Sequence, residues 1–281
     1  MIPVVDSHVR LWTPGTPGAE WLARAPVSLN RTVALADYVA GSRPVPLRAV
    51  VFVEAAAARE TTVELLRVAR ESAVPAVVVG WLDLASLELA RDIAAVRAGA
   101  GGDSLVGVRW SRPSGRDGGR WLVTDRMRAA ARVLADHGLT LDLLVTRSEL
   151  GAAAGLADAH PALTFVIDHL GGAASDADGT ENAWREGMAR LADRPNVVVK
   201  LSGITGDRRS DGSPMSALVG RTIDLFGFER MMYGSDWPVS TQFGDYGETL
   251  ALTERLVGSA PGPGLASLFS ETALRVYGIA A

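Results

Sequence analysis

The chain has 281 residues, of which 48% are hydrophobic and 21% charged, with a formal net charge of -4 at pH 7. This length fits one large α/β domain, and the acidic balance excludes the basic surface that nucleic-acid binding needs. Cysteine is absent, which excludes disulfides, a thiolate nucleophile and cysteine-bound metal sites. The sequence shows neither a secretory leader nor an apolar run of membrane-spanning length, so we expect a cytoplasmic protein.

Eight short apolar segments rich in valine recur along the chain. Each is bounded by glycine, proline or charged residues and is too short for a stable helix, so each is predicted to be a strand. Nearly continuous apolar runs are typical of parallel strands that are covered on both faces. The predicted strands span residues 2–9, 47–55, 75–84, 105–110, 139–145, 163–171, 196–203 and 230–238.

Segments with helical periodicity lie between these strands, and several end in glycine or proline, which stop helices. The predicted helices span residues 59–72, 125–138, 147–161, 181–195 and 246–260. Eight strands that alternate with helices predict an α/β fold, a (β/α)8 TIM barrel, as a single domain over residues 1–281. A doubly wound open sheet is the structural alternative, but no glycine-rich phosphate turn follows the first strand.

Long polar segments mostly follow the strands rather than the helices. In a TIM barrel, active sites gather at the carboxyl ends of the strands, so this asymmetry predicts a functional face there. Arginines in two of these segments could attract an anionic substrate or could simply be solvated. They are Arg112, Arg116 and Arg120 after the fourth strand, and Arg208 and Arg209 after the seventh.

The first strand, "VVDSHVRLW", carries polar residues at every second position. Asp6, His8 and Arg10 should therefore point to the same side of the strand, because strand side chains alternate between two faces. His8 could be a core histidine that is fully hydrogen-bonded. Arg10 could pair with Glu54 on the neighbouring strand, or bind a substrate carboxylate or an oxyanion.

Polar and aromatic residues also stand at the ends of the other predicted strands. If the barrel is right, these residues surround one end of it. Charged groups are costly to bury without partners, so their clustering at this end favours a functional site. Asp236 could instead cap a turn, and Arg109 and Lys200 could be surface charges. The set comprises Glu54, Trp81, Asp83, Arg109, Trp110, Asp168, His169, Lys200, Ser202, Ser235, Asp236 and Trp237.

Other signatures narrow the class of protein. The sequence has no G-x-S-x-G elbow, no Walker motif and no dinucleotide fingerprint, so serine hydrolase, nucleotide and NAD functions are not leading candidates. His137 and His160 fall at predicted helix ends, where a protonated histidine complements the helix dipole, and we assign them no chemistry.

Four motifs carry a resemblance to a known family. The stretches "VVDSHVRLW", "FVIDHLGG", "NVVVKLSGI" and "RMMYGSDWPVS" are similar to the amidohydrolase-2 family of the amidohydrolase superfamily. The closest similarity is to the lactone hydrolases of the L-fuconolactonase and 2-pyrone-4,6-dicarboxylate lactonase group. This resemblance implies a distorted TIM barrel and a catalytic site built from Asp236, His169 and His8.

The resemblance also implies a reaction, the hydrolysis of a small lactone. Asp236 would act as the base that activates water, and the two histidines would orient the carbonyl and stabilise the oxyanion. Arginine and lysine side chains would hold anionic groups of the substrate, and tryptophans could stack on its ring or only pack under loops. The predicted substrate-binding residues are Arg10, Glu54, Arg109, Lys200, Trp12, Trp81 and Trp237.

The first strand departs from the family, whose members usually carry His-x-His where this chain has His8-Val9-Arg10. Arginine has no lone pair to offer a metal and would repel a cation. We therefore predict a metal-independent enzyme with no cofactor, although His8, His169 and Asp236 could still form a three-ligand zinc set.

The expected partner is a small anionic molecule, with no nucleic acid and no membrane; self-association into a homo-oligomer remains open. The alternatives are a cyclase, isomerase or decarboxylase on the same scaffold, or a ligand-binding relative without catalysis.

Overall fold

The computed structural model describes residues 3–43, 45–111, 119–174, 180–206, 213–259 and 261–280. Four arginines that were considered for substrate attraction, Arg112, Arg116, Arg208 and Arg209, lie outside these residues. In the part of the chain that is described, no helix has the length and apolar character needed to cross a membrane.

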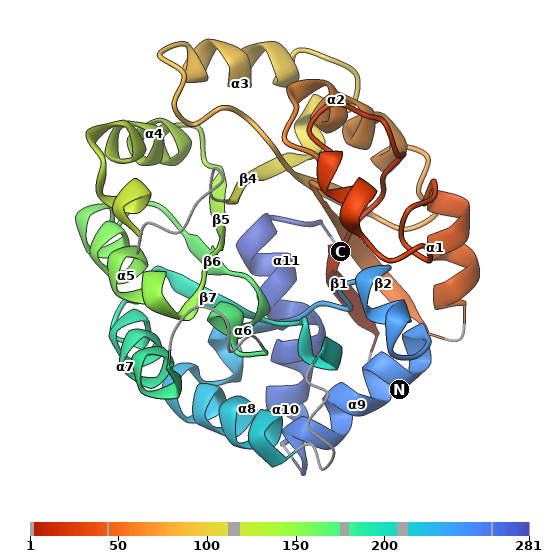
Figure 1. Ribbon diagram of the computed structural model, residues 1–281, viewed down its shortest axis with the longest axis vertical. Helices are drawn as coiled ribbons and strands as arrows, with labels where there is room; N and C mark the ends of the chain where they lie inside the picture. Colours follow the sequence, from red (N-terminus) through yellow and green to blue (C-terminus); the bar gives the residue numbers. More distant parts are fainter. Residues whose placement is uncertain are drawn as a thin grey trace.

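Eight parallel strands follow one another around the molecule in sequence order, and the predicted (β/α)8 barrel is confirmed (Figure 1). Seven strands lie within their predicted segments and are shorter, because the residues at the segment ends leave the sheet, while β4 extends one residue beyond its predicted segment, to Ser111. The strands are β1 (Val4–Val9), β2 (Leu47–Val53), β3 (Ala76–Gly80), β4 (Leu105–Ser111), β5 (Thr140–Leu144), β6 (Phe165–Ile167), β7 (Val197–Leu201) and β8 (Met231–Tyr233).

Helices surround the strands on the outside of the ring (Figure 1). The five predicted helices are confirmed as α2 (Arg59–Ala69), α4 (Asp125–Asp136), α5 (Leu150–Ala159), α7 (Glu181–Ala192) and α9 (Tyr246–Val257). The sequence analysis missed the other helices, of which the longest are α1 (Leu35–Ser42), α3 (Leu89–Arg97) and α8 (Ser213–Phe226). His137 and His160 are the residues at which α4 and α5 end, as predicted.

The two faces of the strands pack against different partners. The outer faces pack under the helices in the main hydrophobic core, while Val5, Ala49 and Val198 face the barrel interior in a smaller cluster. This smaller cluster includes Tyr277 and its neighbours from the last helix, α11 (Thr272–Tyr277), which follows the short α10 (Gly262–Ala266). Figure 1 shows α11 in the middle of the ring of strands. The helix α11 therefore packs against the inner faces of the strands.

The first strand corrects one prediction. His8 faces the barrel interior, but Asp6 does not share its side, because the Asp6 carboxylate accepts hydrogen bonds from Tyr38 of α1 and Tyr246 of α9, outside the barrel. The physical reason is an irregularity: the register of β1 against β2 shifts between Asp6 and Val9. Strict alternation, on which the prediction depended, does not hold across such a shift.

Candidate active site

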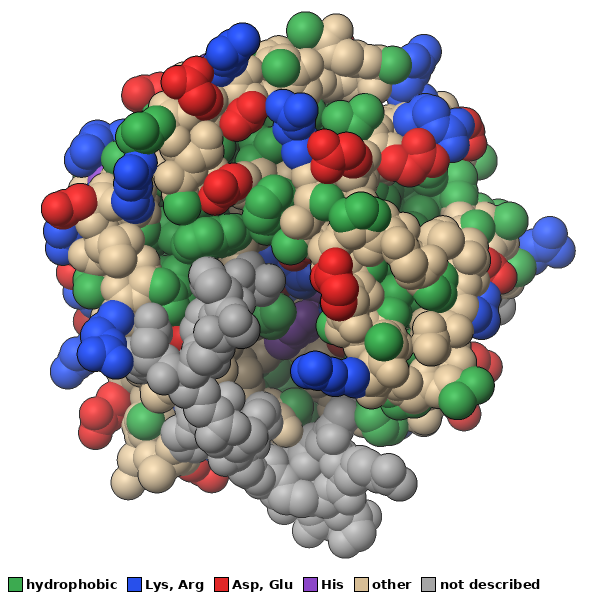
Figure 2. Space-filling view, turned by 45° about the horizontal axis from the view of Figure 1, so that its top comes forward, with side chains coloured by type: hydrophobic (Ala, Val, Ile, Leu, Met, Phe, Trp, Pro, Cys, Tyr) green, Lys and Arg blue, Asp and Glu red, His purple; other side chains and the backbone are tan. Residues whose placement is uncertain are grey.

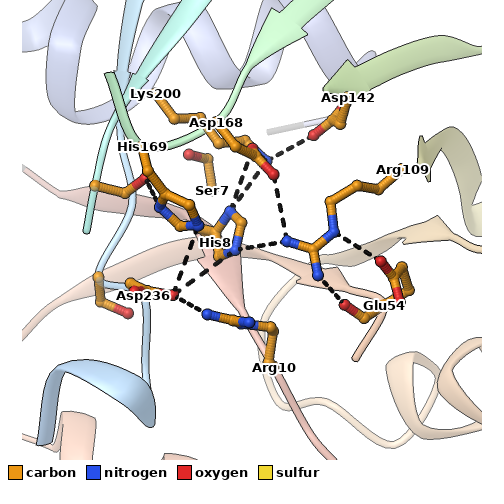
Figure 3. A network of polar contacts seen from close by, with 12 residues as sticks. Ser7, His8, Arg10, Glu54, Arg109, Asp142, Asp168, His169, Lys200 and Asp236 are labelled. Atoms are coloured by element: carbon orange, nitrogen blue, oxygen red, sulfur yellow. Dashed lines mark hydrogen bonds and ion pairs between the residues drawn. The ribbon is translucent and has the colours of Figure 1, made fainter. Parts of the chain in front are cut away.

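Three side chains from the two ends and the middle of the chain meet at the carboxyl ends of the strands (Figure 3). Nε2 of His8 lies 3.9 Å from Oδ1 of Asp236, and Nε2 of His169 lies 4.0 Å from the same oxygen. The two imidazole rings are 4.5 Å apart between centroids. His8, His169 and Asp236 therefore lie close together at one end of the barrel, while their catalytic roles stay predictions.

Unusual backbone conformations present two of these side chains. His169 and Leu170 have φ of 52°, and the next two residues, Gly171 and Gly172, have φ of 62° and 76°, so α6 (His169–Gly172) is a left-handed turn. Asp236 has φ of 56°. A left-handed backbone costs a residue with a side chain about 1–2 kcal/mol. Such conformations gather at functional sites, where the surrounding structure holds them in place.

Arg10 forms an ion pair with the candidate base. Its Nη2 donates to Oδ1 of Asp236 at 2.5 Å, and the two side chains are only 13% and 8% exposed. Burial alone would raise the pKa of Asp236, but the guanidinium of Arg10 and the two histidines hold that pKa below its usual range. Asp236 is therefore ionised at neutral pH. The alternative partner of Arg10, Glu54, is bound to a different arginine.

That arginine is Arg109 on β4. It lies beside His8 and contacts two carboxylates. Its Nε donates to Oε1 of Glu54 at 2.9 Å, and its Nη1 lies 3.3 Å from Oδ2 of Asp168. The same Nη1 lies 3.4 Å from Nε2 of His8. Arg109 is 3% exposed, so the alternative that it is a surface charge is wrong.

Lys200 on β7 lies on the other side of His8 and is fully buried. Its Nζ donates to Oδ2 of Asp142 at 2.7 Å and lies 3.2 Å from Oδ1 of Asp168. The hydroxyl of Tyr277 donates to the same Asp142 oxygen at 2.8 Å, so α11 is tied to this network from below. Lys200 is therefore a core charge as well, and the surface alternative is wrong.

These surroundings fix the charge states of the histidines. Burial lowers the pKa of His8 well below its usual value, although Asp168 acts in the opposite direction, and burial also lowers the pKa of His169. Burial would raise the pKa of Asp168, but Lys200, His8 and Arg109 hold it well below the ordinary range. At neutral pH the site thus combines two neutral imidazoles with an ionised Asp236.

A cavity of about 400 Å³ opens above this group. Figure 2 shows a histidine at the bottom of a hollow on this face, with basic side chains beside it. The cavity is lined by Arg10, Leu144, Val145, Thr146, Arg147, His169, Gly172, Ala174, Gly203 and Asp236. His8, Glu54, Arg109 and Lys200 are not among these residues, so the catalytic assignment of His8 and the substrate-binding assignment of the other three stay predictions.

The three tryptophans that were predicted to bind substrate lie elsewhere. Trp12 lines a larger cavity of about 710 Å³ between the segment after β1 and α2, which none of the three converging residues touches. Trp237 is buried and packs against Tyr38 at 5.4 Å between ring centroids. Trp81 is half-buried and lines neither of these two cavities. A stacking role for these three rings stays a prediction.

The sequence analysis missed several residues of the site. Asp168 was noted at a strand end but given no role, and Asp142 was not considered, although a carboxylate inside the apolar run "LTLDLLV" is a signal. Ser202 lies with Oγ 2.9 Å from Nδ1 of His169. Arg147 lines the cavity and donates to the backbone oxygen of Ala173 at 2.6 Å. Nothing in the sequence pattern indicates Arg147 or Tyr277.

The converging group could in principle hold a metal ion. One ligand atom each from His8, His169 and Asp236 lie within 4.8 Å of one another. A zinc ion needs ligand distances of about 2.0–2.2 Å, which such a spacing permits. Two positively charged side chains already lie next to these ligand atoms, however. Arg10 binds Oδ1 of Asp236, and Arg109 lies near Nε2 of His8.

Comparison with known proteins gives consistent results. The model of the amidohydrolase family matches residues 5–279. An L-fucono-1,5-lactonase of Burkholderia ambifaria is 31% identical, over 98% of this chain and 95% of its own length. An L-fucono-1,5-lactonase of Burkholderia multivorans is also 31% identical, over 98% and 96%. The crystal structure of an amidohydrolase from Burkholderia multivorans with bound zinc has a TM-score of 0.88 at 27% identity, covering 99% of this chain and 100% of its own.

Proposed function

Because the chain belongs to the amidohydrolase family, we propose that it is a hydrolase that opens the ring of a small lactone carrying an anionic group. Two relatives that share 31% of its sequence over nearly full length are L-fucono-1,5-lactonases. The observation that carries the proposal is one arrangement: two neutral imidazoles and one ionised carboxylate converge below a cavity that is lined by arginine.

The residues support a base-activated attack of water. Oδ1 or Oδ2 of Asp236 would take a proton from a water as its oxygen attacks the lactone carbonyl carbon. The tetrahedral oxyanion would receive hydrogen bonds from Nε2 of His169 and His8. When the ring C–O bond breaks, the leaving oxygen would take the proton back from Asp236, so that one water is consumed for each ring opened.

His169 suits the proposed oxyanion role because its other ring nitrogen has a partner. Oγ of Ser202 lies 2.9 Å from Nδ1 of His169. With the serine hydroxyl as the donor of this bond, the proton of the neutral ring would reside on Nε2, which faces Asp236. The residues that line the cavity include Arg10 and Arg147, whose positive charges favour an anionic substrate. An anionic substrate group that also binds Arg10 would weaken the ion pair between Arg10 and Asp236. The Asp236 carboxylate would then be a stronger base.

We propose that this hydrolysis needs no metal ion. The donor set does not fit a divalent cation, because Oδ1 of Asp236 is already bound by Arg10 at 2.5 Å and Nε2 of His8 faces Arg109 at 3.4 Å. A divalent ion between these atoms would meet two positive charges at close range. Arg10 would supply the positive charge beside the reacting carbonyl in place of a metal.

The test is turnover with a panel of lactones of sugar acids and of pyrone carboxylates, followed by mass spectrometry of the product. We expect a product heavier than the substrate by one water, and unchanged rates after exhaustive chelation. A product of unchanged mass, or one that has lost carbon dioxide, would point instead to an isomerase or decarboxylase. The cytoplasmic location, the single domain of residues 1–281 and the absence of a nucleic-acid partner stay predictions of the sequence.

A further inference from the structure

The barrel closes in an irregular way where its last strand meets its first. Ladders of backbone hydrogen bonds join each strand from β1 to β8 to the next, but in the described chain none joins β8 to β1. One isolated bridge pairs Val9 with Trp237, and the backbone N of Arg10 donates to the Trp237 oxygen at 2.9 Å. We call this junction, residues 5–10 and 232–238, the β8–β1 seam.

The seam lies between two of the converging side chains. His8 comes from its β1 side and Asp236 from its β8 side, so the 3.9 Å between them spans a junction without a ladder. Elsewhere in the barrel, the ladder fixes the relative position of neighbouring strands. Here the single bridge, one backbone hydrogen bond and side-chain contacts take the place of a ladder.

The side chain of Asp6 bridges the seam. Its Oδ1 accepts hydrogen bonds from the backbone N of His8 at 3.2 Å and from the backbone N of Ser235 at 2.9 Å. One oxygen thus ties the backbone of His8 to the residue that precedes Asp236. Next to it, the Ser7 hydroxyl donates to the backbone oxygen of Tyr233 at 2.6 Å, and the Arg10–Asp236 ion pair is a further side-chain link across the seam.

The second oxygen of Asp6 is anchored to the outer helices. Its Oδ2 accepts from the hydroxyl of Tyr246 at 2.9 Å and from that of Tyr38 at 3.3 Å. Asp6 is completely buried, and this burial raises its pKa although its hydrogen bonds act in the opposite direction; among the described residues, no cation forms an ion pair with it. A buried acid without a cation is costly, and an apolar residue of similar size is often better for stability alone.

We propose that Asp6 is a positioning residue: it fixes the backbone of His8 relative to that of Asp236 across the β8–β1 seam, through hydrogen bonds and not through its charge. This inference rests on the proposed function for its catalytic measurement, since His8 and Asp236 are there the groups that act on the lactone. A displacement of a reacting group by about 1 Å can cost about 10²-fold in rate.

Two substitutions separate geometry from charge. In Asp6→Asn, the amide oxygen can still accept from both backbone N–H groups, and the amide nitrogen can donate to the two tyrosine hydroxyl oxygens. In Asp6→Leu, the branched side-chain skeleton is kept but every one of these bonds is lost. We expect kcat of Asp6→Asn to stay within about threefold of wild type and kcat of Asp6→Leu to fall by about 10²-fold, with KM nearly unchanged.

A matched control separates positioning from a general loss of stability. Asn196 lies just before β7, and its side-chain amide donates to the backbone oxygens of Ala157, His160 and Leu163 at 3.2, 3.1 and 2.9 Å. Asn196→Leu removes a comparable set of side-chain bonds far from the site. It should lower the melting temperature but leave kcat at the wild-type value.

Histidine NMR keeps the inference independent of the proposed reaction. The chain has only four histidines, so single His→Gln variants assign their ring ¹⁵N signals. Asp6→Leu should shift the signals of His8 and leave those of His137 in place. If wild type opens no lactone, the proposed function fails, while a shift confined to the site histidines still supports positioning by Asp6.

Outcomes that overturn the inference are equally definite. Wild-type kcat and unshifted His8 signals in folded Asp6→Leu would refute it, and a loss in Asp6→Asn as large as in Asp6→Leu would assign the effect to charge. Should Asp6→Leu fail to fold, Ser7→Ala and Tyr246→Phe each remove one bond of the arrangement. These two variants should lower kcat more than Asn196→Leu does. A wild-type kcat in both of them would refute the positioning role of Asp6.

Discussion

The substitution Arg10→His bears most directly on how this site works. It removes the guanidinium next to Asp236 and restores the His-x-His pattern. In the wild type, Nη2 of Arg10 lies 2.5 Å from Oδ1 of Asp236. A zinc ion bound to that oxygen at about 2.1 Å would lie about 4–5 Å from the guanidinium.

The size of the effect follows from Coulomb's law. At an effective dielectric constant of about 20, a divalent ion and a unit charge about 5 Å apart repel each other by about 7 kcal/mol. The carboxylates of Asp236 and of nearby Asp168 offset part of this repulsion, and we take about half to remain. Half of that energy corresponds to a gain in zinc affinity of about 10²–10³-fold when Arg10 is replaced.

The assay is competition for zinc with a coloured chelator, on protein that has been stripped of metal. Arg10→Gln is the matched control, because it removes the charge without adding a ligand and should gain part of the affinity. The KM for an anionic lactone should rise in both variants, while the KM for a neutral lactone should change less. Stoichiometric zinc in the wild type, bound as tightly as in Arg10→His and needed for turnover, would refute the reasoning.

Three further predictions concern the base, the pH dependence and the left-handed turn. Asp236→Asn should lower kcat by about 10²–10⁴-fold with unchanged circular dichroism, because the amide cannot take a proton; near-normal rates would remove Asp236 from the mechanism. The pKa of His169 lies below 6.5 and that of Asp236 below 3.8, so kcat/KM should be level above pH 6.5 and fall on acidification, as His169 gains a proton; an acid limb with its midpoint above pH 6.5 would contradict this assignment. Gly171→Ala should lower the free energy of unfolding by about 1–3 kcal/mol, because its Cβ would lie 2.7 Å from Cδ2 of Leu150 at a φ of +62°. Gly155→Ala in α5, where a Cβ meets nothing within 4 Å, is the control and should not destabilise; equal effects of the two substitutions in urea unfolding would count against the strain.

The barrel was predictable because its signal is repeated eight times. Valine-rich runs such as residues 78–79 and 197–199 are buried on both faces, which is what an unbroken apolar run encodes. The failure in β1 has a local cause, since a register shift between Asp6 and Val9 separates side chains that alternation places together. Such an irregularity depends on the neighbouring strand, and the sequence of β1 alone does not contain it.

The members of the site were easier to predict than their partners. His8, His169 and Asp236 stand at strand ends in motifs that a family resemblance supports. The pairing of Arg10 with Asp236, and of Arg109 with Glu54, depends on which side of each strand faces the interior and on how the barrel closes. These are tertiary facts, and the same charges could have paired in other ways.

Lys200 provides a test of the buried network. Its Nζ contacts Asp142 and Asp168, and all three side chains are fully buried. Removing one partner of a buried ion pair leaves an uncompensated charge and typically costs about 3–5 kcal/mol. Lys200→Met should therefore lower the free energy of unfolding by about that amount.

The double variant Lys200→Met, Asp142→Leu should recover part of this loss, because it removes the stranded carboxylate together with its cation. Arg67→Met, at an exposed cation between two glutamates, is the matched control and should keep a nearly wild-type urea midpoint. The same proteins test the sequence-based assignment of Lys200 to substrate binding. If Lys200 holds the substrate, KM should rise in Lys200→Met and stay high in the double variant. If Lys200 instead neutralises Asp142 and Asp168 next to His8, the free energy of unfolding and kcat should both fall in the single variant. The double variant should then recover more of the free energy of unfolding than of kcat. A Lys200→Met protein as stable as Arg67→Met would show that the network does not need its cation.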